Sequence, residues 1–244
     1  MVIKLETGEK VDLSRGIDLS IPVSSNVGPI AWHVENPSFQ PVMSENWTGM
    51  VEKGGSVNFF DIHFNPHGNG THTECLGHIT SKVYSVNESL KEYFFVSVLI
   101  SVKPQEKNGD LVITESELSA LREYSSMDAL IIRTLPNNSS KKSKNYSSTN
   151  PPYLDVSCLQ ILNQLGVKHL LVDLPSVDKE NDGGKVEFHH QFWGVPDKPR
   201  YDKTITEMIF VPDEVEDGKY LLNLQLAPFE LDAAPSRPII YKFF

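Results

Sequence analysis

Four of the eight histidines in the chain lie within the sixteen residues from 63 to 78. Residues 65–78 read NPHGNGTHTECLGH, so imidazoles and a carboxylate stand among small residues. Metal sites use this mixture: neutral imidazole nitrogens, an anionic oxygen, and glycines that let the backbone approach the ion. His72 and Glu74 would share one face of an extended chain, where one ion could contact both. The cluster therefore predicts a site for a divalent metal.

Three further candidates depend on how the chain turns. His78 joins the face of His72 if the strand continues, and lies beyond it if the chain turns at Gly77. His189 follows a turn-like N-D-G-G segment, and Glu207 lies in an apolar run. Taken alone, these last two are weak signals, because a single acid beside apolar residues is usually exposed at a strand edge.

A second class of enzyme would use a cysteine nucleophile. Cys75 lies three residues from both His72 and His78. Nucleophile and base usually come from distant segments, so this is the weaker hypothesis, and Cys75 is expected to fill space beside the site. The sequence contains no G-x-S-x-G serine elbow, and the G-x-G at Gly68 and Gly70 lacks the third glycine of a dinucleotide site.

The overall charge excludes several classes of partner. The 244 residues include 32 acidic and 22 basic side chains, a formal net charge of −10, and the longest basic cluster is the K-K-S-K run at 141–144. We therefore expect no binding to nucleic acid and none to anionic membranes. The N-terminus lacks the apolar segment of a signal peptide, and no apolar run is long enough to span a membrane. With two cysteines, which allow at most one bridge, a cytoplasmic protein is expected.

The elements that position these residues begin with strands. β-Branched and aromatic runs predict buried strands at 93–102, 129–135 and 168–174. The N-terminal third has strand-like runs and many turns, and is expected to add further β structure. Residues 137–152, rich in serine, asparagine and lysine, are predicted to form a loop.

Two helices are expected between these strands. Thr114 and Glu117 form a capping-box pattern that begins a helix through Tyr124. Asp155 can cap a second helix, which ends at Gly166. Alternating strands and helices separated by short turns predict an α/β fold with a mixed, partly parallel sheet.

Several different short motifs occur, once each and in a characteristic order, along most of the chain. Residues 67–78 resemble the signature H-x-G-T-H-x-D-x-P-x-H. The other segments are D-L-S-x-P at 18–22, an aromatic loop at 32–37, D-A-L-I-I-R-T at 128–134, V-D-L-P-S-V-D at 172–178, and closing pieces at 226–230 and 234–238. Together they resemble the cyclase-like metal-dependent hydrolases, the family of bacterial kynurenine formamidase and isatin hydrolase. We therefore expect residues 1–244 to form a single domain of this kind.

The resemblance implies a swivelling β/β/α fold, commonly in a homodimer or homotetramer. It implies that His78 donates and accepts protons, and that Trp32 is the aromatic residue at the mouth of the substrate site. His189 is preferred to His190, because family members with a His-His pair use the first. The metal ligands that it implies are His72, Glu74, His189 and Glu207.

Three positions depart from the family signature. Gly68 occupies the slot of the first histidine ligand, and His67 stands one position early, where a regular strand would turn it away. An inserted residue in a glycine-rich segment can form a bulge that re-aims a side chain, so we expect His67 to replace the missing ligand, with His63 as the fallback. Glu74 replaces the family's aspartate, and Leu76 replaces its proline.

These observations predict a metal-dependent amidohydrolase, in which metal-activated water cleaves the C–N bond of a small aryl formamide or cyclic amide. Trp32, with Phe39 or Trp47 nearby, would stack a flat substrate. The ligand types support one or two divalent ions: the histidines favour zinc and the carboxylates favour manganese. The alternative is a catalytically degenerate member of the family that binds a small molecule or a metal, since Gly68 fills the first ligand slot.

Overall fold

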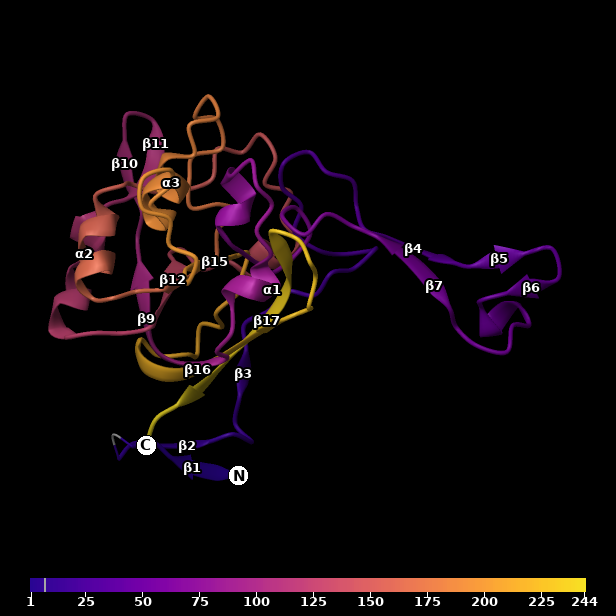
Figure 1. The fold of residues 1–244 in the computed structure, drawn as a ribbon, viewed down its shortest axis with the longest axis horizontal. Coiled ribbons are helices and arrows are strands. Elements are labelled where there is room, and N and C mark those ends of the chain that lie inside the picture. The colour runs from indigo at the N-terminus through magenta and orange to yellow at the C-terminus, as the bar shows by residue number, and fades with distance from the viewer. Residues whose placement is uncertain (7) are drawn as a thin grey trace.

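The computed structural model describes residues 1–6 and 8–244, and its centre is a closed mixed sheet (Figure 1). The strands are hydrogen-bonded in the order β16-β9-β12-β14-β15-β8-β17; β17 pairs with β16 to close the ring, and β3 adds to β17. Their bounds are β3 Ile17–Asp18, β8 His72–Glu74, β9 Phe94–Val102, β12 Ala129–Thr134, β14 His169–Val172, β15 Thr204–Glu207, β16 Gly218–Leu226 and β17 Ala233–Lys242.

The middle of this sheet is parallel, from β9 through β12 and β14 to β15. β8, β16 and β17 pair antiparallel with their neighbours. The three strands expected at 93–102, 129–135 and 168–174 are β9, β12 and β14. Parallel strands covered on both faces are typically continuous hydrophobic runs, which is why the sequence revealed them. The predicted α/β class with a mixed sheet is confirmed.

Helices are few and short: α1 Val86–Ser89, α2 Cys158–Gln164 and α3 Glu187–Trp193. The segment after Thr114 forms the predicted capping box, and the helix expected through Tyr124 is a 3₁₀ helix, Glu115–Glu123. Its buried side chains Leu118 and Leu121 are three residues apart, and this spacing suits three residues per turn. No helix in the described part of the chain is long and apolar enough to cross a membrane.

The second expected helix begins slightly later than predicted. The side chain of Asp155 accepts the backbone N–H of Ser157 at 2.9 Å and so closes the turn before α2, which itself starts at Cys158. Gly166 follows the helix with a φ of +76°, a conformation that favours glycine and ends the helix as expected. The remaining 3₁₀ helices are Val51–Lys53, Leu76–Ile79 and Ser139–Ser143.

Small sheets surround the closed one. The N-terminal third contributes β1 with β2, β4 with β7 and β5 with β6, which confirms the expected extra β structure; β10, β11 and β13 form a fourth small sheet elsewhere. Their bounds are β1 Val2–Lys4, β2 Lys10–Asp12, β4 Ser38–Pro41, β5 Met43–Ser44, β6 Trp47–Thr48, β7 Phe60–His63, β10 Gln105–Lys107, β11 Asp110–Ile113 and β13 Tyr153–Leu154. Residues 38–63, hereafter the arm, form a long hairpin that projects away from the body (Figure 1).

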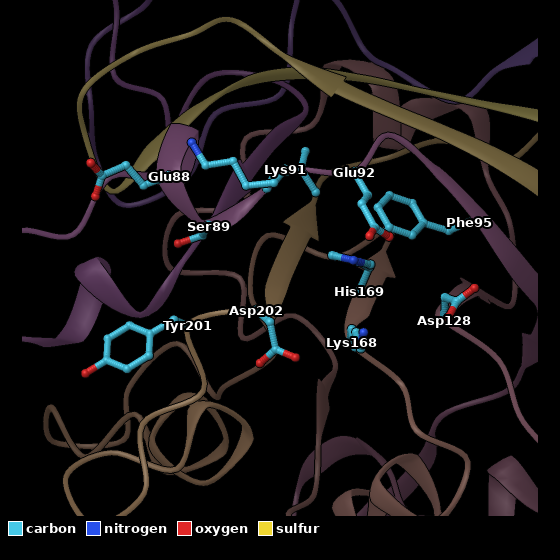
Figure 2. A pocket seen from close by; sticks show the side chains of 11 residues that line it. Glu88, Ser89, Lys91, Glu92, Phe95, Asp128, Lys168, His169, Tyr201 and Asp202 are labelled. Atoms are coloured by element: carbon cyan, nitrogen blue, oxygen red, sulfur yellow. The ribbon is translucent and has the colours of Figure 1, made fainter.

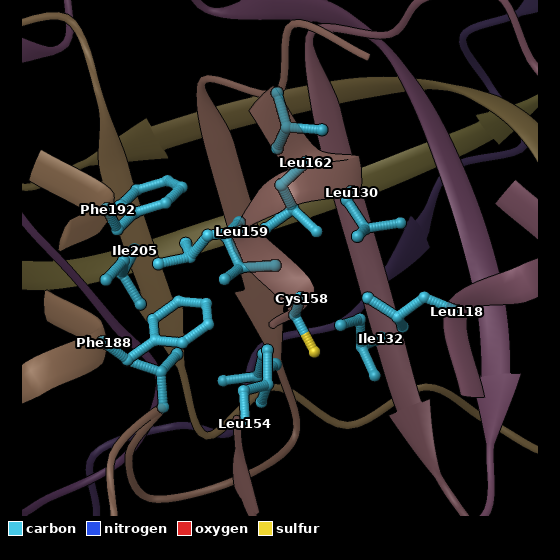
Figure 3. Packing of buried hydrophobic residues seen from close by; sticks show 14 of the residues in the cluster. Leu118, Leu130, Ile132, Leu154, Cys158, Leu159, Leu162, Phe188, Phe192 and Ile205 are labelled. Carbon is cyan, nitrogen blue, oxygen red and sulfur yellow. The ribbon is translucent and has the colours of Figure 1, made fainter. Parts of the chain in front are cut away.

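Buried hydrophobic side chains form two clusters, one on each face of the parallel strands. On β12, Leu130 and Ile132 belong to one cluster and Ala129 and Ile131 to the other, because side chains alternate along a strand. The first cluster lies between the sheet and helices α2 and α3, which contribute Cys158, Leu159, Leu162, Phe188 and Phe192 (Figure 3). The second includes Leu99, Leu171, Tyr220, Leu222 and Ile240.

Candidate metal centre

Two neighbouring strands carry the centre of the site. β8 pairs antiparallel with β15 and places His72 opposite Glu207. Residues two apart on a strand share a face, so Glu74 projects on the same side as His72. Nε2 of His72 lies 3.5 Å from Oε2 of Glu207. All three side chains are buried.

His189 reaches the same point from helix α3. Its Nε2 lies 3.0 Å from Oε1 of Glu74 and 3.9 Å from Oε1 of Glu207. Behind the ring, Oδ2 of Asp178 lies 2.6 Å from Nδ1 and also accepts the backbone N–H of His189. The same carboxylate accepts the N–H of Phe188, so it fixes the start of α3 and the imidazole together. A carboxylate behind the ring is the usual support for a metal-ligating histidine.

His67 is brought in by a turn, and not by the bulged strand expected from the sequence. Backbone hydrogen bonds to the carbonyl of Asn65 close this turn, and β8 begins only five residues after His67. The turn directs the ring to the cluster, where its Nδ1 lies 3.0 Å from Oε2 of Glu74. A side chain at Gly68 would collide with Val34, which explains why a histidine cannot occupy the usual slot.

Asp232 joins the cluster from the loop between β16 and β17. Its Oδ2 lies 2.8 Å from Nε2 of His67 and 3.3 Å from Nδ1 of His78. The two rings stack with centroids 4.1 Å apart. His78 belongs to the 3₁₀ helix Leu76–Ile79, and its side chain is 33% exposed, whereas those of His72 and Glu74 are buried. His78 is thus the imidazole of the group that is open to a ligand in solution.

Two buried atoms at the centre have no hydrogen-bond partner. Among the described residues, Nε2 of His72 and Oε2 of Glu74 are two of the three buried side-chain polar atoms in this condition. Nδ1 of His72 donates to the carbonyl of Gly70 at 3.1 Å, so Nε2 holds a lone pair that points into the cluster. Nδ1 of His67 lies 3.0 Å from Oε2 of Glu74 but makes no well-oriented hydrogen bond to it. A buried lone pair or carboxylate oxygen that makes no hydrogen bond costs about 1–3 kcal/mol unless a cation satisfies it. The donor set therefore fits a divalent metal.

The ligand atoms also lie close enough to share an ion. One group, His67, His72 and Glu74, and a second, Glu74, His78 and His189, each hold one ligand atom per residue, all within 4.8 Å of one another. Glu74 belongs to both groups. Glu207 lies at the edge, where its Oε1 also accepts the backbone N–H of Val177 at 3.0 Å.

Protons balance the charge of the cluster. Burial disfavours the charged form of His67, but hydrogen bonding to Asp232 and proximity to Glu74 outweigh it and raise the pKa of His67 to about 10. Burial opposes charging of His189 as well, but Asp178 and Glu74 raise the pKa of His189 to about 10. Protons therefore occupy positions between nitrogens and carboxylates that a metal would take, and metal binding must release them.

A cavity of about 400 Å³ opens over the cluster. Its lining includes Trp32, His67, His78, His189, Glu207 and the segment 178–184. Trp32, the expected aromatic residue of the substrate mouth, has a φ of +59°, a strained backbone for a bulky residue. Phe39 and Trp47 are not in this lining, which corrects the expectation that they lie nearby. Both belong to the arm, where the centroid of the Trp47 ring lies 6.0 Å from that of Phe59.

A second cavity, of about 320 Å³, lies at the amino ends of the parallel strands (Figure 2). Asp128, Lys168 and His169, next to the starts of β12 and β14, are among the residues that line it. None of the site residues predicted from the sequence lines this cavity in the described chain.

Sequence reasoning missed two acids of the site. Asp178 stood in one of the matched motifs but was given no role, and Asp232 had no spacing signal at all. His190 lies outside the cluster, with its Nδ1 3.4 Å from the carbonyl of Val195.

The surroundings of Cys75 disfavour the alternative in which this residue is the nucleophile. Its thiol donates to the carbonyl of Tyr84 at 3.3 Å, and burial raises its pKa, so the thiolate is disfavoured. The fallback ligand His63 lies on the arm, exposed. The structure thus brings together the side chains that the sequence singled out: His67, His72, Glu74, His78, His189 and Glu207.

The chain resembles known proteins over most of its length. The family model described as putative cyclase matches residues 17–179, and the chain belongs to this family. The kynurenine formamidase of Bacillus anthracis is 27% identical over 229 residues, 93% of this chain and 97% of that protein. The kynurenine formamidase of Bacillus cereus is 28% identical over 229 residues, which again cover 93% of this chain and 97% of that protein.

Solved structures share the fold. Isatin hydrolase A from Labrenzia aggregata, bound to benzyl benzoate, superposes with a TM-score of 0.67 at 13% identity, covering 93% of each chain. A potential metal-dependent hydrolase with cyclase activity superposes with a TM-score of 0.65 at 14% identity, covering 93% of this chain and 97% of that one.

Proposed function

We propose that this protein is a metal-dependent amidohydrolase that cleaves the C–N bond of a small aryl formamide or cyclic amide. The carrying observation is the pair of buried atoms, Nε2 of His72 and Oε2 of Glu74, that make no hydrogen bond beneath an open cavity. Relatives named kynurenine formamidase, matched over 93% of this chain, support the substrate class.

The residues that would hold one or two divalent ions, zinc or manganese, are His67, His72, Glu74, His189 and Glu207. A bound ion of this kind lowers the pKa of water from 15.7 toward about 7 and polarises a carbonyl. Asp178 and Asp232 keep the rings of His189 and His67 in place through their far nitrogens.

His78 moves the proton in this proposal. The Asp232 carboxylate accepts a hydrogen bond from Nδ1 of His78, so Nε2 keeps the lone pair that accepts a proton. The same ring returns that proton to the leaving nitrogen, which departs neutral. Its partial exposure gives substrate access to the ring.

The cavity sets the size and shape of the substrate. Its volume of about 400 Å³ suits a small aromatic amide. Trp32 at its edge would stack the flat ring and hold the carbonyl over the cluster. Two cysteines, both buried and unpaired, support a reducing, cytoplasmic compartment for this chemistry.

Metal analysis combined with an assay tests the proposal. Purified protein grown with added zinc or manganese should contain one to two equivalents per chain and release formate from N-formylaniline or N-formylkynurenine. Bound metal without hydrolysis of any aryl formamide or cyclic amide would favour the degenerate, ligand-binding alternative. Absence of metal after such growth would remove the metal assignment itself.

A further inference from the structure

The wall of the cavity beside the metal cluster carries more acid than base. Apart from the cluster itself, the described lining consists of Trp32 and residues of the segment 176–186. Lys179 is the only lysine or arginine among the described residues that line the cavity. A substrate whose carbonyl lies over the cluster must place its remaining part against this wall. Three carboxylates belong to the wall: Asp178, Glu180 and Asp182.

Backbone hydrogen bonds hold two of these carboxylates in place. The two carboxylate oxygens of Glu180 accept the backbone N–H groups of Ser148 and Asn150. The carboxylate of Asp182 accepts the backbone N–H groups of residues 184–186. Their negative charges are therefore fixed at the wall, since neither side chain can turn away without losing several hydrogen bonds.

The single lysine of the wall is held by an acid that lies outside the lining. Nζ of Lys179 lies 2.6 Å from Oδ2 of Asp110, the first residue of β11. The same carboxylate accepts the side-chain amide of Asn150 at 2.9 Å and the hydroxyl of Tyr153 at 3.1 Å. The Asp110 side chain is 13% exposed, so little water screens the pair. Lys179 is therefore already paired and is not free to bind an anion in the cavity.

The histidines of the lining do not replace this lysine. Ring nitrogens of His67 and His189 lie within 3.0 Å of carboxylates of the site, and Nδ1 of His78 lies 3.3 Å from Asp232. In the proposed function these rings hold the ion or move the proton. The part of the cavity beyond the cluster thus lacks a cation of its own in the described chain.

We propose that Asp110 sets the charge specificity of the site: by holding Lys179, it restricts the enzyme to aryl amides that are neutral or carry an ammonium group. This inference rests on the proposed function and names the substrate class within it. A carboxylate on the substrate would face Glu180 and Asp182 without a donor, and burying an unpaired charge is costly. An ammonium group would meet the same acids as partners, and the face of Trp32 also attracts cations.

Three aryl formamides that differ only in the meta substituent test this specificity in the wild-type, metal-loaded chain. They are N-formylaniline, 3-formamidobenzoate and 3-formamidobenzylamine. We expect kcat/KM to be at least about 10-fold higher for the benzylamine than for the benzoate, with N-formylaniline between them, since a charged hydrogen bond is worth at least that factor. The difference should shrink as salt is added, because salt screens charges. Equal values, or the reverse order, would overturn the proposal.

A matched pair of variants tests the part played by Asp110. In Asp110→Asn the lysine is released, so the ratio of kcat/KM for 3-formamidobenzoate to that for N-formylaniline should rise about 10-fold. Asp155→Asn removes the same charge from the pair with Lys107, whose atoms lie 4.0 Å apart outside the lining, and should leave the ratio unchanged. The double variant Asp110→Asn/Lys179→Met keeps the net charge of the wild type and should lose the gain. A gain that persists in the double variant, or that Asp155→Asn reproduces, would refute the role of the pair.

Binding measured by calorimetry separates this inference from the proposed function. Benzoate and benzylamine are small enough for the cavity and are not hydrolysed. We expect the Kd of benzoate to fall about 10-fold in Asp110→Asn, whereas that of benzylamine should not fall. If these affinities change as expected but no aryl formamide is hydrolysed, the proposed function fails and the charge specificity stands. If aryl formamides are hydrolysed but the Kd of benzoate is the same in both proteins, the charge specificity fails alone.

Discussion

His72 is the residue whose replacement most directly tests the metal centre. Its Nε2 is buried and unpaired in the cluster, so an ion bound there depends on it. We expect His72→Ala to weaken metal binding by more than about 100-fold, since loss of a supporting partner alone costs about 10- to 100-fold. Elemental analysis of the purified variant measures this. His190→Ala, a matched change outside the cluster, should keep its metal. Full metal content in His72→Ala would show that His72 is not a ligand.

His78 should separate catalysis from metal binding. Its side chain is partly exposed beside the cluster, and Asp232 holds its Nδ1. Removing a general acid–base group lowers turnover by about 10²- to 10⁴-fold. We therefore expect His78→Ala to keep its metal and lose turnover by that factor, measured as formate release under saturating substrate. A variant that loses its metal would make His78 a ligand.

Asp232 is expected to support metal binding through His67. Its carboxylate accepts from Nε2 of His67 at 2.8 Å, so the opposite nitrogen can face Glu74. In Asp232→Asn, we expect metal affinity to fall by about 10- to 100-fold, measured by competition with a chelator. Glu230→Gln, two residues away on the same loop, is the control. Equal affinity in both variants would show that Asp232 does not support the ligand.

The sequence predicted the site residues because they cluster along the chain or stand in ordered motifs. His72 and Glu74 follow from a two-residue spacing. The glycines beside His67 predicted a bulge, whereas a turn closed on the carbonyl of Asn65 brings this ring to the cluster. Asp232 could not be predicted, because only the closed sheet brings its loop beside residue 67. Phe39 and Trp47 were assigned wrongly, since aromatic type says nothing of the direction in which a hairpin projects.

Among the elements, the 3₁₀ helix Glu115–Glu123 tests how local signals act. Thr114 accepts from the backbone of its first turn, and Glu117 accepts from the Thr114 N–H at 2.8 Å. Loss of such a cap costs about 1 kcal/mol. We expect Thr114→Ala to lower the free energy of unfolding by that amount in urea denaturation. Glu123→Ala, exposed at the other end of the helix, should change it by less than about 0.5 kcal/mol.

This helix also shows which features the sequence pattern predicts and which it does not. The capping box predicted where it begins, and its leucines predicted which face is buried. The spacing of three residues between Leu118 and Leu121 fits both helix types, so it does not distinguish them; both side chains are buried in the core. The apolar runs of β9, β12 and β14 were read correctly, because a strand covered on both faces has few alternatives.

At the scale of the whole molecule, the closure of the sheet could not be predicted from the sequence. β16 pairs with β9, more than a hundred residues earlier, and β17 pairs with both β16 and β8. No local spacing encodes such pairings. They nevertheless place β8 between β15 and β17, which is what brings His72 opposite Glu207. The motif order predicted the family, and the family model matched at 17–179 supports that inference.

A buried histidine far from the metal cluster should make the free energy of unfolding depend on pH in the acidic range. His169 is 4% exposed and begins β14, and its Nδ1 is hydrogen-bonded to Oγ1 of Thr204 at 2.8 Å. Burial, with a smaller contribution from Lys168, lowers its pKa to about 4, against 6.5 for the free side chain. Above pH 6.5 both states are neutral at this residue. As the pH falls from 6.5 toward 4, the unfolded chain binds a proton that the folded chain refuses, so stability falls.

The expected loss is about 3 kcal/mol over that interval, because one pKa unit corresponds to about 1.4 kcal/mol. Urea denaturation at pH 7.5, 6, 5 and 4 measures it for the wild type and for His169→Gln, which keeps a hydrogen-bonding group near Thr204 but does not titrate. The difference in free energy of unfolding between the two proteins should shift in favour of the variant as the pH falls. Other titrating groups are common to both and cancel in this difference. A difference that stays constant from pH 7.5 to 4 would mean that His169 takes up its proton in the folded protein as readily as in the unfolded chain.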